Sequence, residues 1–401
     1  MRAGTDDPRR LQPPLVMRYA ETRQRIVASV LVVTALVACR QTEEPPERWV
    51  QPSHVIAPEG TDSLGQFGPA LDVLGCTIVV TDWMDTVVRV LDDGMRKRGV
   101  LGEPGRGPGE LLSPRAVAIG SDSVVSVLDG GRRRLLRYAF DGRLLADVPL
   151  GGGVASHGPI GPVRALADGR LLDYWLSTPV LGYYVPKNVF DTIPLVSALM
   201  PDGSPAGGGW GAPERTPEPD DLLLRFILQA GDIALVGDTL FVLRNGRGVI
   251  EVYSLSAPAR VPVRTVQLRR YRPLVAPREV HGRVTERGLV VGTGEVTFPQ
   301  STRAFAVDDQ RRFYVATLLG VPGDERDGPP AEALIVYSSN GEQLAAWRWR
   351  GTATTALRLA RDGSLVRLGY PDRRGDLGRH IEIFRPLFQG PGQRCNWIGT
   401  N

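Results

Sequence analysis

Lysine, cysteine and long apolar runs are scarce in this sequence of 401 residues. The only lysines are Lys97 and Lys187, and the three cysteines are Cys39, Cys76 and Cys395. No segment keeps an apolar repeat of 3.6 residues, which argues against a helical fold. No uninterrupted apolar run reaches the roughly 20 residues of a transmembrane helix. Together these scarcities favour a fold built from β-strands.

Local catalytic and nucleic-acid signatures are also missing. The chain has no G-x-S-x-G motif, and its four histidines show neither H-x-x-H nor H-x-H spacing. The glycines of segment 102–109 mimic a phosphate loop, but Pro108 and a following strand argue against one. The basic clusters 96–98 and 132–134 are short and flanked by acidic turns, as on a solvated surface. No nucleic-acid partner is therefore expected.

The first 38 residues are expected to be a signal peptide. Arg23 and Arg25 precede the small and apolar run 26–38, which ends at Cys39. The ending L-V-A-C resembles a bacterial lipobox, in which Cys39 becomes the lipidated first residue; the alternative is an ordinary signal peptide with a fortuitous cysteine. Segment 39–48 then reads as a flexible tether. Removing the signal peptide, which carries a net charge of +3, leaves about +1 of the chain's +4.

Segment 102–150 sets the pattern for the remainder, 49–401. A glycine-rich connection is followed by short apolar runs at 116–119, 124–128, 135–140 and 144–150, separated by turns such as Asp141-Gly142. Runs of this kind with Asp-Gly punctuation are typical of consecutive antiparallel hairpins. Such a small sheet cannot bury both its faces alone, so repetition is expected.

The pattern occurs six times. The first turns of the units are separated by 47, 46, 70, 70 and 54 residues, and they lie at Gly75, Asp122, Asp168, Asp238, Asp308 and Asp362. A period near 40–50 residues with four strands per unit is typical of a β-propeller blade. The sequence therefore predicts an all-β, six-bladed β-propeller with four antiparallel strands per blade.

The motif R-G-P-G-E-L-L-S-P-R-A-V-A-I at 106–119, followed by V-L-D and R-L-L-R-Y-A-F-D-G, resembles six-bladed propellers of the NHL-repeat type. More closely, it resembles bacterial lipoprotein-type six-bladed propellers. The resemblance is sharp over 102–142 and weaker elsewhere. It implies a fold rather than one activity, because propellers host lyases, lactonases, scaffolds and peptide binders.

Two devices are expected to close the ring. Blade six lacks a clear fourth strand after Phe384, and the strand candidate 49–56 upstream of blade one would supply it. Cys76, in the first hairpin, and Cys395, near the C-terminus, are expected to form a disulfide in an oxidising compartment. The alternative is two separate buried thiols.

The loops predict where a ligand binds. Tight turns join strands one to two and three to four, whereas the long segments join strands two to three or one blade to the next. Both long classes emerge on one face, and long loops on a rigid scaffold commonly carry function. The candidate ligand-binding residues are Trp83, Asp85, Tyr174, Trp175, Arg244, Asn245 and Tyr370. For Tyr174 and Trp175 the alternative is packing between blades.

A metal site is the alternative interpretation of the same face. His157, His281 and His380 lie in long-loop regions of three units. Lyases of the NHL type assemble zinc from histidines on separate blades, and three imidazoles with an open position suit a catalytic zinc. Lactonase-type propellers instead hold a divalent cation such as calcium, but no matching Glu, Asn and Asp set is recognisable here.

The sequence thus predicts a monomeric, lipid-anchored extracytoplasmic propeller without a cofactor, held to a membrane at the periplasm or cell surface. It is expected to bind an envelope protein, peptide or glycan through its long-loop face. The alternative is a metal-dependent propeller enzyme, with zinc or calcium at the channel mouth. A third possibility is a sensory or scaffold subunit whose partner binds the blade edges.

Overall fold

The computed structural model describes residues 48–49, 51–56, 67–82, 84–92, 97–151, 162–174, 184–185, 194–213, 231–244, 247–271, 282–285, 288–291, 302–319, 331–349, 352–370, 380–388 and 394–397. Internal contacts divide the chain into units 1–46 and 47–401. The expected signal peptide, Cys39 and nearly all of the tether lie outside the described residues. Every strand of the described residues belongs to the second unit.

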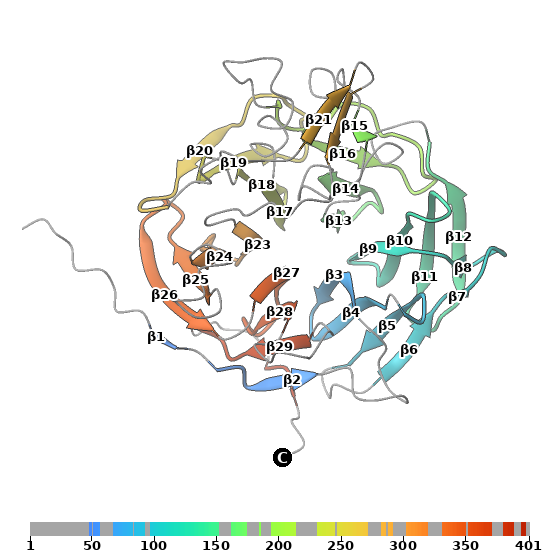
Figure 1. Cartoon of the computed structure of the whole chain (residues 1–401), viewed down its shortest axis with the longest axis horizontal. Coiled ribbons are helices and arrows are strands. Elements are labelled where there is room, and N and C mark those ends of the chain that lie inside the picture. The colour runs from blue at the N-terminus through green and yellow to red at the C-terminus, as the bar shows by residue number, and fades with distance from the viewer. Residues whose placement is uncertain are drawn as a thin grey trace, which may run out of the picture. The chain divides into compact units, whose positions relative to one another are not determined.

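The second unit is an all-β, six-bladed β-propeller (Figure 1). The inner strand of each blade contacts the inner strand of the next, and the last contacts the first. Within the described part of the chain there is no helix, and so none that could cross a membrane. Blades one and two comprise β3 (Phe67–Leu74), β4 (Thr77–Asp82), β5 (Val87–Leu91), β6 (Lys97–Leu101), and β9 (Pro114–Ile119), β10 (Val124–Asp129), β11 (Arg134–Ala139), β12 (Leu144–Pro149).

Blade three differs from its neighbours at its outer edge. In the described part of the chain its strands are β13 (Val163–Ala165), β14 (Leu171–Tyr174) and β16 (Val196–Leu199). Isolated bridges from Val196 to Trp210 and from Leu199 to Pro205 take the place of a regular fourth strand. Blades four and five are regular and comprise β17 (Gly231–Val236), β18 (Thr239–Arg244), β19 (Val249–Ser254), β20 (Arg264–Gln267), and β23 (Thr302–Val307), β24 (Phe313–Leu319), β25 (Ala331–Tyr337), β26 (Gln343–Trp349).

The N-terminal segment completes blade six, as the sequence predicted. Blade six contains β27 (Thr352–Leu359), β28 (Leu365–Tyr370) and β29 (His380–Phe384), and β2 (His54–Ile56) pairs antiparallel with β29. The expected single strand is divided, because β1 (Arg48–Trp49) pairs in parallel with β26 of blade five. The chain therefore covers two outer edges before it enters blade one.

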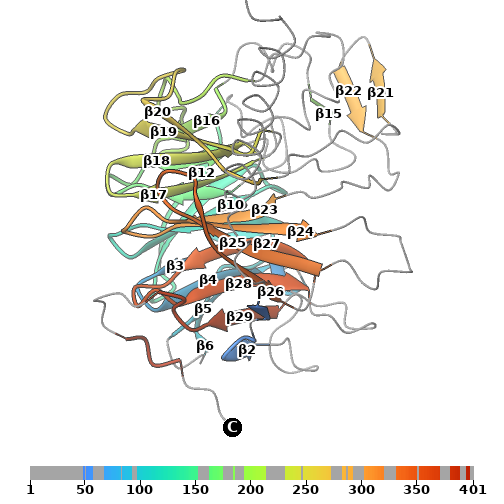
Figure 2. The ribbon, with the colours of Figure 1, turned by 90° about the vertical axis from the view of Figure 1, so that its left-hand side faces the viewer.

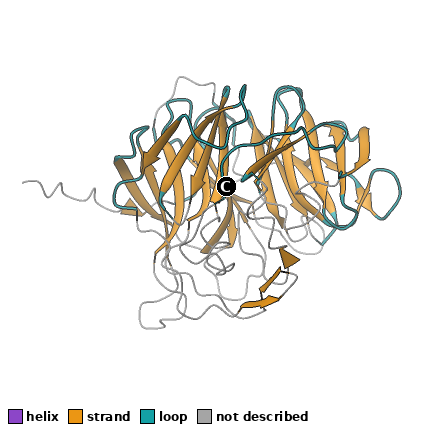
Figure 3. Cartoon of the chain, turned by 90° about the horizontal axis from the view of Figure 1, so that it is seen from above, coloured by secondary structure: helices purple, strands orange, loops and turns teal. Residues whose placement is uncertain are grey.

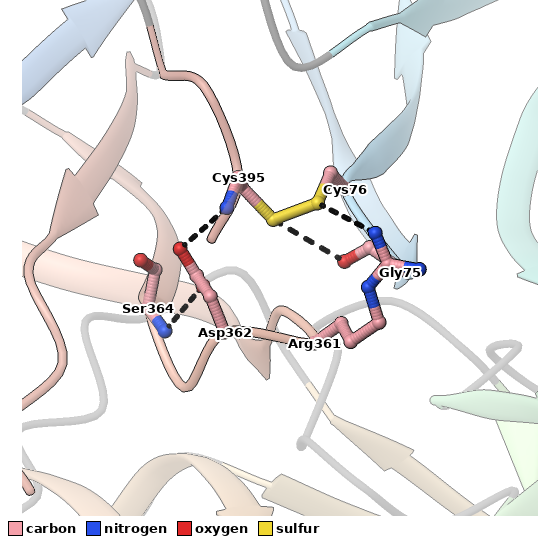
Figure 4. Close-up of a disulfide and its surroundings, with 6 residues drawn as sticks. All are labelled: Gly75, Cys76, Arg361, Asp362, Ser364 and Cys395. Carbon is pink, nitrogen blue, oxygen red and sulfur yellow. Dashed lines mark hydrogen bonds between the residues drawn. A yellow bond between two sulfur atoms is a disulfide. The ribbon is translucent and has the colours of Figure 1, made fainter. Parts of the chain in front are cut away.

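The opposite end of the chain returns to blade one through a disulfide (Figure 4). Cys76 and Cys395 are bonded, with their Cα atoms 5.6 Å apart, across 319 residues of sequence. Asp362 accepts a hydrogen bond from the backbone N–H of Cys395 at 3.1 Å. The backbone N–H of Arg361 donates to the carbonyl of Gly75 at 2.9 Å. The predicted pairing is thus present and ties the C-terminal segment to the first hairpin.

The core is divided among the interfaces between blades. Ile78 and Val80 pack toward blade six, whereas Val79 packs toward blade two, and all three are fully buried. Sheets buried on both faces require continuous apolar runs rather than alternation. Apolar clusters of this kind occupy the other interfaces as well. This explains why the strands read as short, uninterrupted apolar segments.

Candidate functional site

One face of the ring is formed by tight turns that aspartates stabilise. In these turns the aspartate carboxylate accepts a hydrogen bond from the backbone N–H two residues later. Asp141, Asp168 and Asp362 do so at 3.0, 3.0 and 2.8 Å. The glycine that follows Asp168 has φ of +82°, a conformation that side chains disfavour. Where these turns stand, little chain is left for recognition; blade four has a longer connection, 255–263, on the same face.

The opposite face receives the long connections. Strand two ends at Tyr174 and strand three begins at Val196 in blade three, and blade four ends at Gln267 whereas blade five begins at Thr302. Two such connections meet in an additional sheet, in which β15 (Tyr184–Val185) pairs with β22 (Gly288–Val291), and β22 pairs with β21 (Gly282–Thr285). This sheet stands apart from the blades, on the side opposite the tight turns (Figures 2 and 3).

Two predicted ligand-binding residues lie in one buried cluster between blades three and four. Tyr174 ends β14 and Arg244 ends β18, and both are at most 2% exposed. Arg244 Nη1 lies 3.3 Å from Glu251 Oε2, which also accepts a hydrogen bond from the Tyr253 hydroxyl at 2.7 Å. Burial raises the pKa of Tyr174 above its ordinary value. Tyr174 therefore packs between blades, the alternative that the sequence offered.

Asp85 lies where a ligand could reach it. It follows β4 on the long-loop face, and its side chain is 55% exposed and paired with Arg89. Met84 beside it is 68% exposed. Tyr370 is the last residue of β28 and pairs with Thr352. The other three predicted residues, Trp83, Trp175 and Asn245, lie outside the described residues.

The predicted histidine set is only partly visible. His157 and His281 lie outside the described residues. His380 is the first residue of β29, where it pairs with Gly369 and is 8% exposed. Within the described ranges, no three His, Cys, Asp or Glu side chains are grouped as metal ligands.

Sequence reasoning missed a buried acid at the long-loop end of blade three. Asp173 is 1% exposed, and among the described residues its Oδ1 has no hydrogen-bond partner. It pairs in the sheet with Val163 and Ser197, and it shares a strand face with Leu171 of the blade two–three core. Desolvation by burial raises the pKa of Asp173 to about 7. The only sequence signal was a charge inside the run L-L-D-Y.

A second missed feature is a set of four charges on the inner strands. Asp72 and Asp232 lie on β3 and β17, and Arg164 and Arg358 lie on β13 and β27. Arg358 Nε is 3.1 Å from Asp72 Oδ1, and Arg164 Nη2 is 3.3 Å from Asp232 Oδ1. None of the four side chains is more than 11% exposed. We call this set the channel quartet, because inner strands border the central channel.

A third polar cluster joins blades five and six. Glu332 accepts hydrogen bonds from Trp349 Nε1 at 3.0 Å, from the Thr354 backbone at 2.8 Å and from Arg367 Nη2 at 3.0 Å. Arg367 also bonds to Glu382. Every member is at most 8% exposed. Because these bonds satisfy the buried charges, the cluster fastens two blades together.

No family model and no characterised protein matches this sequence. Solved structures do match. A member of the DUF4221 family from Bacteroides vulgatus has a TM-score of 0.52 at 8% identity, covering 85% of this chain and 99% of that one. A protein named "putative exported protein" from Bacteroides fragilis has a TM-score of 0.51 at 11% identity, covering 86% and 98%. At these identities the likeness shows the fold alone, a six-bladed β-propeller.

Proposed function

We propose that this protein is a binding module of the cell envelope that recognises a protein, peptide or glycan through its long-loop face. The observation that carries the proposal is the additional sheet formed by β15, β22 and β21. Tyr184 lies opposite Val290 and Val185 lies opposite Leu289, so two connections from different blades are hydrogen-bonded together. Because this sheet is built from long connections and lies outside the blades, it favours a recognition surface on that face.

The two faces differ in what they offer a ligand. On the tight-turn face, Asp141, Asp168 and Asp362 already accept backbone hydrogen bonds, although Val261 in the blade four connection is 74% exposed. On the long-loop face, Met84 and the half-exposed carboxylate of Asp85 lie side by side in the chain. An exposed apolar side chain beside a charge suits an amphipathic partner such as a peptide.

The test shortens one connection on each face. In the first variant a short Gly-Ser linker replaces residues 273–300, which removes β21 and β22. In the control, residues 256–262, between β19 and β20 on the tight-turn face, are replaced in the same way. Both variants are compared with the unaltered chain on peptide and bacterial-glycan arrays. The proposal expects array ligands to be lost from the first variant and kept by the control, at unchanged melting temperature. Equal binding by both variants would contradict it.

We further propose that Cys39 carries a lipid that anchors the domain outside the cytoplasm. The Cys76–Cys395 disulfide supports an oxidising compartment. Mass spectrometry of the mature N-terminus should find a diacylated or triacylated Cys39, and the Cys39→Ser variant should leave the membrane fraction. An unmodified Cys39 in membrane-free protein would refute the anchor.

The NHL-type relationship of the blades is part of this proposal. It is supported by the hydrogen bonds of Asp129, the last residue of the V-L-D motif. Its carboxylate accepts hydrogen bonds from the backbone N–H groups of Leu112 and Ser113 at 2.8 and 2.9 Å, and from Gly131 at 2.8 Å. The glycine-rich connection is thereby fixed to the end of strand two. The motif therefore shapes a blade junction rather than a ligand site.

A further inference from the structure

We propose that the central channel binds a small oxyanion between the guanidinium groups of Arg164 and Arg358. This inference is independent of any ligand on the long-loop face. It concerns residues of blades three and six, which lie opposite each other in the ring (Figure 1).

The two arginines occupy matching positions. Arg164 pairs with Leu172 and Arg358 pairs with Val366, in each case one residue before the last pair of the first hairpin ladder. Each donates from Nη1 to the carbonyl of the residue before it, Val163 or Leu357, at 2.8 Å. These bonds hold each guanidinium group against its own inner strand, at matching positions of the two ladders.

Each guanidinium keeps a donor for which the described residues supply no acceptor. Among the described residues, Arg358 donates from Nε to Asp72 and from Nη1 to Leu357, which leaves Nη2 free. Arg164 donates from both of its Nη atoms, and within the described ranges its Nε has no acceptor. The Arg164 and Arg358 side chains are 8% and 11% exposed, so each keeps a small solvent-accessible part. Because the inner strands of a propeller surround its central channel, we infer that this small exposed part faces the channel.

The positive charge of Arg358 also acts on Arg164. The pKa of Arg164 is lowered to about 10, first by desolvation and next by the positive charge of Arg358. An anion placed between them would remove this repulsion and would meet N–H donors from both sides.

The acids of the channel quartet do not supply that anion. Asp72 Oδ2 accepts the backbone N–H of Ile119 at 2.9 Å, and Asp232 Oδ2 accepts that of Phe305 at 2.9 Å. Their remaining oxygens are held by Arg358 and by Arg164 with the N–H of Ile233. Each carboxylate is therefore turned toward the next blade, and the free guanidinium edges are left for an exogenous group.

The chemistry of the donors defines the ligand class. Two N–H donors on separate guanidinium groups suit an ion with two or more charged oxygens, such as a carboxylate or phosphate, better than a halide. The oxyanion could be free in solution or carried at the end of a larger molecule that enters the channel.

The experiment uses the mature chain, residues 39–401 without lipid, in chloride buffer of constant ionic strength. Inorganic phosphate and acetate are titrated by calorimetry and by melting temperature. We expect saturable binding, and we expect Arg358→Gln to weaken it by about tenfold or more through loss of a charge-assisted bond. Arg170→Gln, which alters an exposed turn pair with Asp168, should bind as the unaltered chain does. Absence of saturable binding, or unchanged binding by Arg358→Gln, would overturn the proposal.

A second measurement covers the case in which Arg358→Gln does not fold. Crystals of the unaltered protein soaked in selenate should show anomalous density between Arg164 and Arg358, and density only elsewhere would refute the site. Binding of a tripeptide with a free C-terminal carboxylate is then compared with binding of the same tripeptide amide. This comparison distinguishes a free oxyanion from one carried by a larger molecule. Binding of phosphate and of the acid but not the amide indicates a carried carboxylate, whereas binding of phosphate alone indicates a free ion.

Discussion

Asp72 and Asp232 make the same pair of contacts on opposite sides of the ring. Each carboxylate accepts the backbone N–H of the inner strand in the following blade, from Ile119 or Phe305, at 2.9 Å. Each also pairs with an arginine of the preceding blade. Blades six, one and two are joined in this way, as are blades three, four and five. The inner edge of a propeller exposes unpaired backbone groups, and this arrangement satisfies two of them.

The first prediction concerns this contact. Asp72→Ala should lower the free energy of unfolding by about 3 kcal/mol, because it leaves Arg358 unpaired and a buried N–H unsatisfied. Asp232→Ala should have an effect of similar size. Urea unfolding measures both. Asp122→Ala, which removes an exposed turn residue 3.7 Å from Arg137, is the control and should cost less than about 1 kcal/mol. Equal losses of unfolding free energy in all three variants would contradict this prediction, because Asp72 and Asp232 would then contribute no more than an exposed turn residue.

The second prediction concerns the disulfide. Its loop of 319 residues places its stabilisation at the upper end of the usual range, about 4–5 kcal/mol. Reduction should therefore lower the melting temperature markedly. The Cys76→Ser, Cys395→Ser double variant should melt at the temperature of the reduced protein, and reductant should not change its melting temperature. A reduced protein as stable as the oxidised one would contradict this.

The third prediction concerns the buried acid of blade three. The pKa of Asp173, raised to about 7 by desolvation, lies above the value of about 3.9 in an unfolded chain. Its contribution to stability is therefore full below about pH 4 and is lost as the pH rises toward 7, by about 4 kcal/mol in total. Asp173→Asn should remove this decline. Urea unfolding at pH 4, 6 and 8 checks the difference in slope, with Asp141→Asn as control. Parallel curves for the Asp173 variant and the unaltered protein would refute it.

The fourth prediction separates binding from metal-dependent catalysis. Purified protein should hold no stoichiometric zinc or calcium, and chelator should leave its melting temperature unchanged. Elemental analysis and thermal unfolding with and without chelator measure this. A stoichiometric metal lost together with stability would instead support the enzyme interpretation, and His157, His281 and His380 would be the first residues to replace.

Local sequence patterns predicted the blades because the signals involved are local. A run such as Ile78-Val79-Val80 is apolar throughout since both faces of its sheet are buried. Asp-Gly turns mark hairpins through hydrogen bonds only two residues long. Ring closure was also predictable, because a missing outer strand and an unused strand candidate match each other.

The polar interior was not predictable in the same way. The Asp72–Arg358 pair joins residues 286 apart in sequence, and only the closed ring brings them together. Tyr174 and Arg244 stand at strand ends next to long connections, where exposure was the natural expectation, yet both are buried between blades. Asp173 lies in an apolar strand, so the sequence suggests that it is buried. The sequence does not suggest that Asp173 Oδ1 has no hydrogen-bond partner among the described residues.

Recognition through the long-loop face can be tested by photo-crosslinking from each face. Met84 on the long-loop face and Leu145 near the Asp141-Gly142 turn are both exposed apolar residues, at 68% and 40%. A photoreactive phenylalanine analogue at each position is activated in intact cells, and the products are identified by mass spectrometry. We expect one recurrent envelope protein or glycopeptide to be captured from position 84 and not from position 145. Capture of the same partner from position 145 alone would contradict it.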